Sequence, residues 1–248
     1  MPTKETLAQA EMKAKGKPLQ NMFNQVPQSY DFLNRLLTLR LDEYWRKKAV
    51  QAILRENPRE VMDLGTGTGD LALRLARKDQ KINITGYDFS PAMLEVAGQK
   101  TQKAGLKNLT FVEGDAADMP FEDNRFDVIA ISFAFRNITF KNRNTELYLK
   151  EILRTLKPGG KFIIVESSQP KNKLIRWGFH QYLHFIVSGI GGKLSRSKGA
   201  YHYLAYSAKN FYTRNELTRL LEERNFVHTH HIPLFLGSAA VTIAQKPE

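Results

Sequence analysis

The chain has 248 residues, a length that suits one large domain or two small ones. Apolar residues make up 42% and charged residues 25%, which excludes wholesale disorder. The lack of cysteine excludes disulfides, cysteine–zinc sites and a cysteine nucleophile. The first residues are polar and no apolar run reaches the ~20 residues that span a bilayer, so we expect a cytoplasmic protein.

The charge is uneven along the chain. The formal net charge is +12, and the segment 167–215 holds eight basic residues and no acidic one. Such a segment attracts phosphate-bearing partners, either nucleic acid or an anionic membrane surface. The plainer interpretation is a solvated basic face that only aids solubility.

The apolar pattern predicts the elements in chain order. Residues 1–20 are polar without a period, which predicts a mobile tail before a single domain at 21–248. Helical spacing predicts helices near 32–37, 45–53, 71–76, 91–97, 149–156 and 213–221. Strands are predicted at 61–64, 82–87, 109–112, 127–132, 161–166, 226–232 and 239–244.

This alternation predicts an α/β fold with a doubly wound, mostly parallel sheet of seven strands. Helices precede the sheet, and a helical insertion at 170–212 comes before the last two strands. Ligands in such sheets bind outside the carboxyl ends of the strands.

A glycine-rich loop follows the first predicted strand. Its pattern is an acid, Asp63, then Gly65, Gly67 and Gly69 at alternate positions. A dinucleotide fold has the spacing G-x-G-x-x-G, and no Gly-Lys-Ser/Thr follows to make a P-loop. The remaining common user of such a loop is S-adenosylmethionine, and the plainer alternative is a tight turn between strand and helix.

Two further acids end the next strands. Asp88 ends the second strand, where a carboxylate accepts hydrogen bonds from both ribose hydroxyls. Asp115 follows the third strand, where a carboxylate accepts from the adenine amino group. A single acid there is more often a helix cap, but three in consecutive units beside the glycine loop predict a nucleoside cofactor.

Several blocks of the chain resemble one family. They are Tyr30–Asn34 with Trp45, Asp63–Asp70, Ile131–Asn137, Arg154–Gly160 through Ser168, and Ala200–Leu204. These blocks resemble the ubiquinone/menaquinone biosynthesis C-methyltransferases, which are class I S-adenosylmethionine-dependent enzymes. The chain departs from the family's first signature at Thr38 and Asp42, where the family often has Ser and His.

The resemblance implies C-methylation of a prenylated quinol ring, that of demethylmenaquinol or the corresponding ubiquinone-pathway benzoquinol. Carried over, the cofactor contacts fall on Thr68, Asp88, Asp115, Ala116 and Ser132. The residues implied to bind the substrate are Tyr30, Tyr201 and Tyr203.

The catalytic residues are expected just after the fourth strand. We expect Arg136 to stabilise charge on the ring oxygen and Asn137 to orient that oxygen, because their block faces the transferring methyl group. The alternative for Arg136 is a helix cap or a pair with a nearby acid. His202, in the family's substrate block, is the predicted base, and no metal is expected although His180 and His184 lie one helical turn apart.

An uncharged segment lies inside the basic region. Residues 177–192 carry no formal charge, and basic residues bracket them. This pattern predicts a segment that docks peripherally on the anionic inner face of the membrane and receives the prenyl tail. A core helix or a homodimer interface would explain the same stripe.

Three competing functions stay open on the sequence. An RNA methyltransferase would use the basic segment, although no appended RNA-binding domain is visible. A methyltransferase for another prenylated aromatic acceptor would share the motifs. An assembly subunit with a degenerate fold is the non-enzyme alternative, which the intact glycine loop and the three acids argue against.

Overall fold

A computed structural model describes residues 35–191 and 198–248, without the side chains of 190–201. The expected tail at 1–20 lies outside these residues, as does the first half of the expected helix near 32–37. The strands are β1 (Glu60–Leu64), β2 (Asn83–Asp88), β3 (Leu109–Glu113), β4 (Phe126–Ser132), β5 (Leu156–Ser167), β6 (Val227–Leu234) and β7 (Ala239–Gln245). The helices are α4 (Leu41–Arg55), α5 (Asp70–Lys78), α6 (Pro91–Lys103), α7 (Phe135–Thr139), α8 (Thr145–Thr155), α9 (Lys173–Tyr182), the π-helix η1 (Leu183–Gly191), α11 (Lys198–Lys209), α12 (Arg214–Glu222) and the 3₁₀ turn η2 (Phe235–Gly237).

The strands form one sheet of seven in the order β3-β2-β1-β4-β5-β7-β6. The first five are parallel, and β7 runs antiparallel to both of its neighbours. The predicted α/β fold with a doubly wound, mostly parallel sheet is therefore confirmed, with its antiparallel strands at one edge. The order reverses between β1 and β4, which is the point where such sheets bind ligands.

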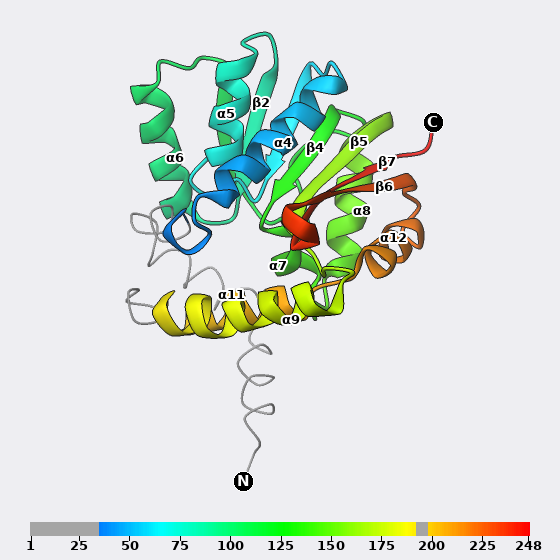
Figure 1. Ribbon diagram of the computed structural model, residues 1–248. Helices are drawn as coiled ribbons and strands as arrows, with labels where there is room; N and C mark the ends of the chain where they lie inside the picture. Colours follow the sequence, from blue (N-terminus) through cyan, green and yellow to red (C-terminus); the bar gives the residue numbers. More distant parts are fainter. Residues whose placement is uncertain (1–34, 192–197) are drawn as a thin grey trace.

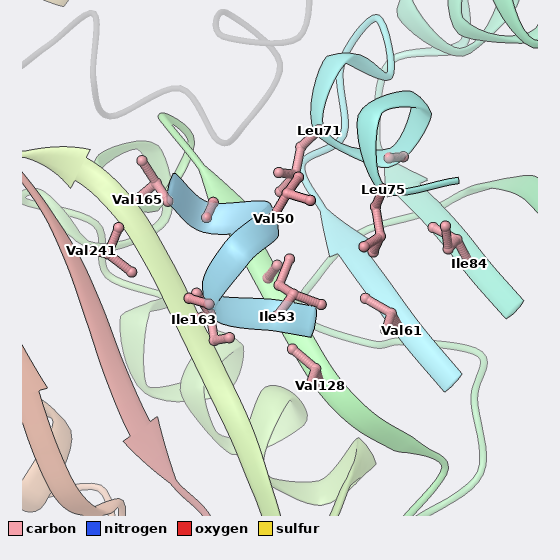
Figure 2. Packing of buried hydrophobic residues seen from close by; sticks show 14 of the residues in the cluster. Val50, Ile53, Val61, Leu71, Leu75, Ile84, Val128, Ile163, Val165 and Val241 are labelled. Atoms are coloured by element: carbon pink, nitrogen blue, oxygen red, sulfur yellow. The ribbon is translucent and has the colours of Figure 1, made fainter. Parts of the chain in front are cut away.

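Side chains alternate between the two faces of the sheet, as period-2 strands require. On one face Val61, Val128 and Ile163 pack beneath α4 and α5, as Figure 2 shows. On the other face Met62 and Phe162 belong to the core that includes apolar residues of α8 and α12. Burial on both faces explains the continuous apolar runs in the sequence.

One strand differs from its prediction. β5 begins at Leu156, five residues before the expected strand, because Leu156 pairs with Phe126 ahead of a register shift. The residues between carry Gly159 in a left-handed conformation (φ 72°), and its N–H donates to the carbonyls of Lys246 and Pro247. Pro158, Gly159 and Gly160, which follow the end of α8, thus belong to an irregular first part of β5.

The outer strand β6 is irregular. Its register against β7 shifts between Val227 and His230, and His228 within the shift has a positive φ of 52°. Pro233 near its end has no N–H to donate.

The helical insertion lies across the end of the molecule where α7 follows β4. In it η1 continues directly from α9, and α11 packs against η1 (Figure 1). Leu183 and Val187 of η1 and Ala205 of α11 form a small buried cluster with Leu37. None of the helices in the described ranges is both long enough and apolar enough to cross a membrane. The division of the chain at residue 21, and the role of 170–212, stay predictions.

Candidate active site

A cavity opens at the carboxyl ends of β1, β2 and β4. Its space of about 900 Å³ includes open solvent. The lining residues come mainly from the glycine loop and from the ends of β1, β2 and β4. The cavity therefore occupies the predicted position at the topological switch point.

The glycine loop is fixed by backbone contacts. The N–H of Gly65 donates to the carbonyl of Tyr87 at 2.7 Å, and Gly65 has a φ of 64°. A Cβ there would lie 2.8 Å from the Cβ of Ala134, so a side chain would clash with the end of β4. Gly69, at φ 82°, begins α5. Glycine is required because the loop both turns left-handed and touches a neighbouring loop.

Asp63 is buried at the end of β1. Its Oδ2 accepts from the Thr66 hydroxyl at 2.7 Å and from the N–H of Ala72 at 3.1 Å, which ties the loop to α5. Its Oδ1 is buried and has no hydrogen-bond partner. Burial raises the pKa of this carboxyl to about 7, against the hydrogen bonds and Arg46 that lower it. Asp63 therefore supports the loop through Oδ2, and it is among the residues that line the cavity.

Asp88 is buried at the end of β2 and lines the cavity. Its Oδ2 accepts from the N–H of Gly67 at 2.8 Å and its Oδ1 from the N–H of Ser90 at 2.9 Å. Burial raises the pKa of the carboxyl, and these hydrogen bonds oppose the shift. A carboxylate oxygen accepts more than one hydrogen bond, so each retains acceptor capacity toward the cavity.

Asp115 is placed differently from the other two acids. Its side chain is exposed and is not among the cavity-lining residues, while Gly114 and Ala116 on either side of it are. Its Oδ1 accepts from the N–H of Ala117 at 3.0 Å, the local cap that a single acid most often makes. The side chain of Asp115 is therefore not positioned at the cavity, where the predicted adenine contact would need it.

Thr68 and Ser132 both line the cavity. Thr68 is buried in the loop, and its carbonyl accepts from Nζ of Lys100 at 3.1 Å. The hydroxyl of Ser132, at the end of β4, is buried without a hydrogen-bond partner. Unpartnered buried polar atoms are rare in proteins, so this hydroxyl is a candidate contact for a ligand of the cavity.

Phe133 follows Ser132 in a left-handed conformation, with a φ of 57°. Its N–H donates to the carbonyl of Val165 at 2.8 Å, which fixes the turn out of β4. Its ring centroid lies 5.6 Å from that of Trp45 on α4. A bulky residue in this conformation is strained, and such strain clusters at ligand sites.

Arg46 on α4 is a cavity residue that the sequence analysis did not identify. It is buried, its Nη1 donates to Oδ2 of Asp42 at 2.5 Å, and its guanidinium lies 5.3 Å above the ring of Phe133. The only sequence signal for Arg46 was its position one helical turn after an acid, Asp42, on a helix with an apolar face. That pattern is common on solvated helices, so it did not point to a site.

Arg136 lies on α7 beside the cavity but does not line it. Its guanidinium forms a buried ion pair with Glu166 of β5, whose Oε2 also accepts from the N–H of Arg136 at 3.3 Å. This is the pairing with an acid that the sequence left open as the alternative. The neighbouring Asn137 does line the cavity, and its carbonyl accepts from Nδ2 of Asn142 at 3.0 Å.

The predicted substrate block lies on α11. His202 is exposed, and its Nδ1 lies 3.1 Å from the hydroxyl of Ser188. Tyr203 is partly buried, and burial and the nearby Glu166 raise the pKa of its phenol, with Arg136 opposing. None of the residues of this block with a described side chain is among those that line the cavity. Tyr30 and the side chain of Tyr201 lie outside the described residues.

The described residues contain no group of three or more His, Cys, Asp or Glu side chains that could hold a metal ion. His180 lies 3.0 Å from Oε1 of Gln169 through its Nε2. The polar groups that do converge are those of the cavity. They comprise buried carboxylates, an unpartnered hydroxyl and a buried guanidinium, a set that suits a polar nucleoside with a charged tail.

Comparison with known proteins gives the same family as the sequence motifs. The model of the ubiE/COQ5 methyltransferase family matches residues 11–246. A demethylmenaquinone methyltransferase of Thermotoga maritima is 38% identical over 92% of this chain and 95% of its own length. A relative in Geotalea daltonii named ubiquinone/menaquinone biosynthesis C-methyltransferase UbiE is 37% identical, over 94% and 97%.

Solved structures agree on the fold. An S-adenosylmethionine-dependent methyltransferase structure from Methanococcus maripaludis has a TM-score of 0.63 at 23% identity and covers 91% of this chain and 94% of its own. A Haemonchus contortus phosphoethanolamine N-methyltransferase 2 in complex with S-adenosylmethionine has a TM-score of 0.58 at 18% identity, over 82% and 53%. The extensive match of the family model and these relatives show that the chain belongs to the ubiE/COQ5 methyltransferase family.

Proposed function

We propose that this protein methylates a ring carbon of a prenylated quinol with S-adenosylmethionine as methyl donor. The observation that carries the proposal is the match, over more than nine-tenths of the chain, to relatives named demethylmenaquinone methyltransferase. The names of the relatives reported above do not favour the alternatives, an RNA methyltransferase, an assembly subunit or an enzyme for another aromatic acceptor. Demethylmenaquinol is the first candidate acceptor, with the related benzoquinol of the ubiquinone pathway as the second.

The cavity residues fit the nucleoside part of this cofactor. Asp88 is the proposed acceptor for the ribose hydroxyls, because both its oxygens are fixed by the backbone and still have lone pairs. The glycine loop lets the ligand approach the backbone, and we assign Ala116, which lines the cavity, to the adenine contact. We retain Asp115 as a contact at the rim, where its exposed carboxylate would have to turn toward the base.

Bound S-adenosylmethionine supplies an electrophilic methyl group on a positively charged sulfur. The chain must hold an electron-rich ring carbon in line with that methyl group, and such positioning is worth about 7–11 kcal/mol of the barrier. Ser132 and Asn137 line the cavity beyond the glycine loop. We assign Asn137 to orienting a ring hydroxyl and Ser132 to the transferring end of the cofactor.

We assign two catalytic roles, that of the base and that of the group that stabilises charge on the ring, to residues that do not line the cavity. Loss of a proton from the ring hydroxyl increases electron density on the ring, and the methylated carbon then loses its own proton to a base. We keep His202 as the proposed base and Tyr203 with it as a substrate contact, because α11 lies beside the end of the molecule that holds α7. Arg136 would act on ring charge only by sharing its guanidinium with Glu166.

The direct test is transfer of a labelled methyl group from S-adenosylmethionine to reduced demethylmenaquinol, to the demethylated benzoquinol and to bulk RNA. We expect transfer to a quinol and none to RNA. The Asp88→Ala variant should be inactive in the same assay at low cofactor concentration. Transfer to RNA with none to either quinol would overturn the proposal.

The exposed apolar side of α9 and η1 supports a further part of the proposal, peripheral docking on an anionic membrane. Leu174 is 74% exposed, Trp177 61% and Phe185 63%. The basic residues Lys173 and Arg176 lie on the same helix, and α9 carries no acidic residue. Apolar side chains beside cations suit an interface with anionic lipid, where a prenylated acceptor resides.

Vesicle co-sedimentation tests the docking surface. We expect binding to anionic vesicles that weakens with salt and is lost in the Trp177→Ser/Phe185→Ser variant. Leu147→Ser is the matched control, because Leu147 is an exposed leucine of α8 outside this surface. If the protein ignores anionic vesicles at low salt and sediments as a dimer that the double variant breaks, the surface is a homodimer interface instead.

A further inference from the structure

The helical insertion leaves the sheet and returns to it at one buried side chain, that of Gln169. This residue follows the end of β5 by two positions and is 7% exposed. Its amide nitrogen lies 3.1 Å from the carbonyl oxygens of Ala208 and Lys209, and 3.4 Å from that of Phe211. The start and the end of the insertion at 170–212 are thus joined through a single side chain.

The orientation of this amide follows from its partners. Carbonyl oxygens only accept hydrogen bonds, so the nitrogen with its two N–H groups must face the three carbonyls. The amide oxygen Oε1 then faces α9, where Nε2 of His180 lies 3.0 Å away. Because Oε1 only accepts, Nε2 of His180 carries the proton. Gln169 therefore binds α9 through its acceptor and the end of α11 through its donors.

Each side of the amide supplies a contact that its helix needs. The last carbonyls of a helix have no partner within the helix, and Gln169 supplies donors to those of α11. α9, which is described in full, contains no buried residue, so apolar packing contributes little to its position. His180 joins α9 to Gln169, and Nε of Arg176 donates to the carbonyl of Pro170 at 2.8 Å. Both helices are therefore held to the end of β5 by polar contacts that meet at Gln169 and its neighbour.

The end of β5 is also where the buried Glu166 pairs with Arg136 of α7. Tyr203 of α11 lies near enough to this ion pair for both charges to act on the pKa of its phenol. Gln169 lies only three residues beyond Glu166 and holds the same helix that carries Tyr203. A shift of α11 at the Gln169 contact would therefore move Tyr203 relative to the ion pair.

We infer that Gln169 is a positioning residue for the acceptor. It holds α9 and α11 at the end of β5 in the arrangement in which Tyr203 meets the acceptor. The inference rests on the proposed function for the contact between α11 and the quinol, and it adds the residue that sets where α11 lies. Gln169 is not among the residues that line the cavity, so its loss should act on the acceptor and not on S-adenosylmethionine.

The first test separates positioning from general support of the fold. Gln169→Met keeps the length of the side chain and removes its hydrogen bonds. We expect kcat/KM for reduced demethylmenaquinol to fall by about 10-fold to 100-fold, the scale of a misplaced reactant, while calorimetry shows an affinity for S-adenosylmethionine within about twofold of the wild type. Asn108→Leu is the matched control, because this amide donates to the carbonyls of Asp79 and Ile82 directly before β3, at the opposite end of the strands from the insertion. The control should change neither value.

The second test examines the two contacts of Gln169 without the chemistry. His180→Ala removes only the contact with α9, whereas Gln169→Met removes the contacts with both helices. Hydrogen exchange of the backbone amides should therefore be faster in α9 alone with His180→Ala, and faster in both α9 and α11 with Gln169→Met. The strands β1 and β4 should exchange as in the wild type in both variants.

Each contrary outcome decides against the proposal. A folded Gln169→Met with wild-type kcat/KM for the quinol overturns it, as does an equal fall in Asn108→Leu or an equal loss of cofactor affinity. If Gln169→Met does not fold, His180→Ala decides, because wild-type exchange in its α9 would show that the amide does not hold this helix. A wild type that transfers no methyl group to a quinol overturns the proposed function itself, and the exchange rates then still show whether Gln169 joins the two helices.

Discussion

The cofactor end of the sheet and the helical layer of α9, η1 and α11 are built in opposite ways. At the sheet, polar side chains are buried and bound to backbone groups, as Asp63 and Asp88 are. In the helical layer, large apolar side chains such as Trp177 are exposed. The contrast teaches that one region is pre-organised for a polar ligand, while the other presents apolar area that only a further surface or ligand would cover.

The Arg136–Glu166 pair lies beside the cavity, near enough to Tyr203 of α11 to influence its pKa, and breaking it should have the largest effect. Arg136→Ala leaves Glu166, whose residue is 2% exposed, as a buried charge without its cation. We expect the free energy of unfolding to fall by about 3–5 kcal/mol in denaturant titrations.

The double variant Arg136→Met/Glu166→Leu is the control, because it removes both charges and should recover most of the stability. A folded Arg136→Ala of wild-type stability that methylates slowly would instead assign Arg136 to the transition state. The pair would then belong to the chemistry and not to the support of the fold.

Asp88→Ala tests the pre-organised region. The variant removes the acceptor for Gly67 and Ser90 as well as the proposed ribose contact, so S-adenosylmethionine should bind at least about 10-fold more weakly, the value of one charged hydrogen bond. Asp88→Asn keeps one oxygen and should lose less affinity. Calorimetry showing unchanged affinity in Asp88→Ala would contradict the assignment.

The pH dependence of binding examines Asp63. Its pKa in the ligand-free protein is raised to about 7, and a positively charged cofactor in the cavity should bind more tightly when this carboxyl is ionised. Affinity should therefore rise about tenfold from pH 6 to pH 8 and level off above pH 8. Asp63→Asn should remove this dependence, whereas an unchanged slope in the variant would assign the titration to another group.

The same shift has the opposite consequence for stability. A carboxyl whose folded pKa exceeds its unfolded value destabilises the ionised folded state, so the ligand-free protein should lose stability between pH 4 and pH 7 from this group. Asp63→Asn should flatten that part of the stability profile. Thermal unfolding across this pH range, with the cofactor absent, measures the effect.

The smallest effect is expected in the helical layer. Trp177→Ala should change the free energy of unfolding by less than about 0.5 kcal/mol, because its side chain is largely exposed. Leu183→Ala in the adjoining η1, which is buried, is the matched comparison and should cost about 2–5 kcal/mol. Equal losses in the two variants would mean that Trp177 packs in a core, and the contrast between the regions would fail.

The sequence predicted most of the sheet because its strands and its glycine loop are local patterns. Asp88 and Ser132 fall at strand ends, where chain order alone places them at the cavity. The burial of Arg46, the exposure of Asp115 and the pairing of Arg136 with Glu166 were not predictable in this way. The first and third features depend on how elements far apart in sequence pack against each other, and the second depends on how one loop turns. Neither kind of arrangement produces a periodic pattern in the sequence.

The irregular outer strand β6 has a consequence for the behaviour of the protein in solution. An open sheet edge offers unpaired N–H and C=O groups to the edges of other molecules, which is a route to aggregation. The kink at His228 and the missing N–H of Pro233 interrupt that row of groups. Strand-to-strand association of copies of this chain through β6 is therefore disfavoured, even in a crowded cell.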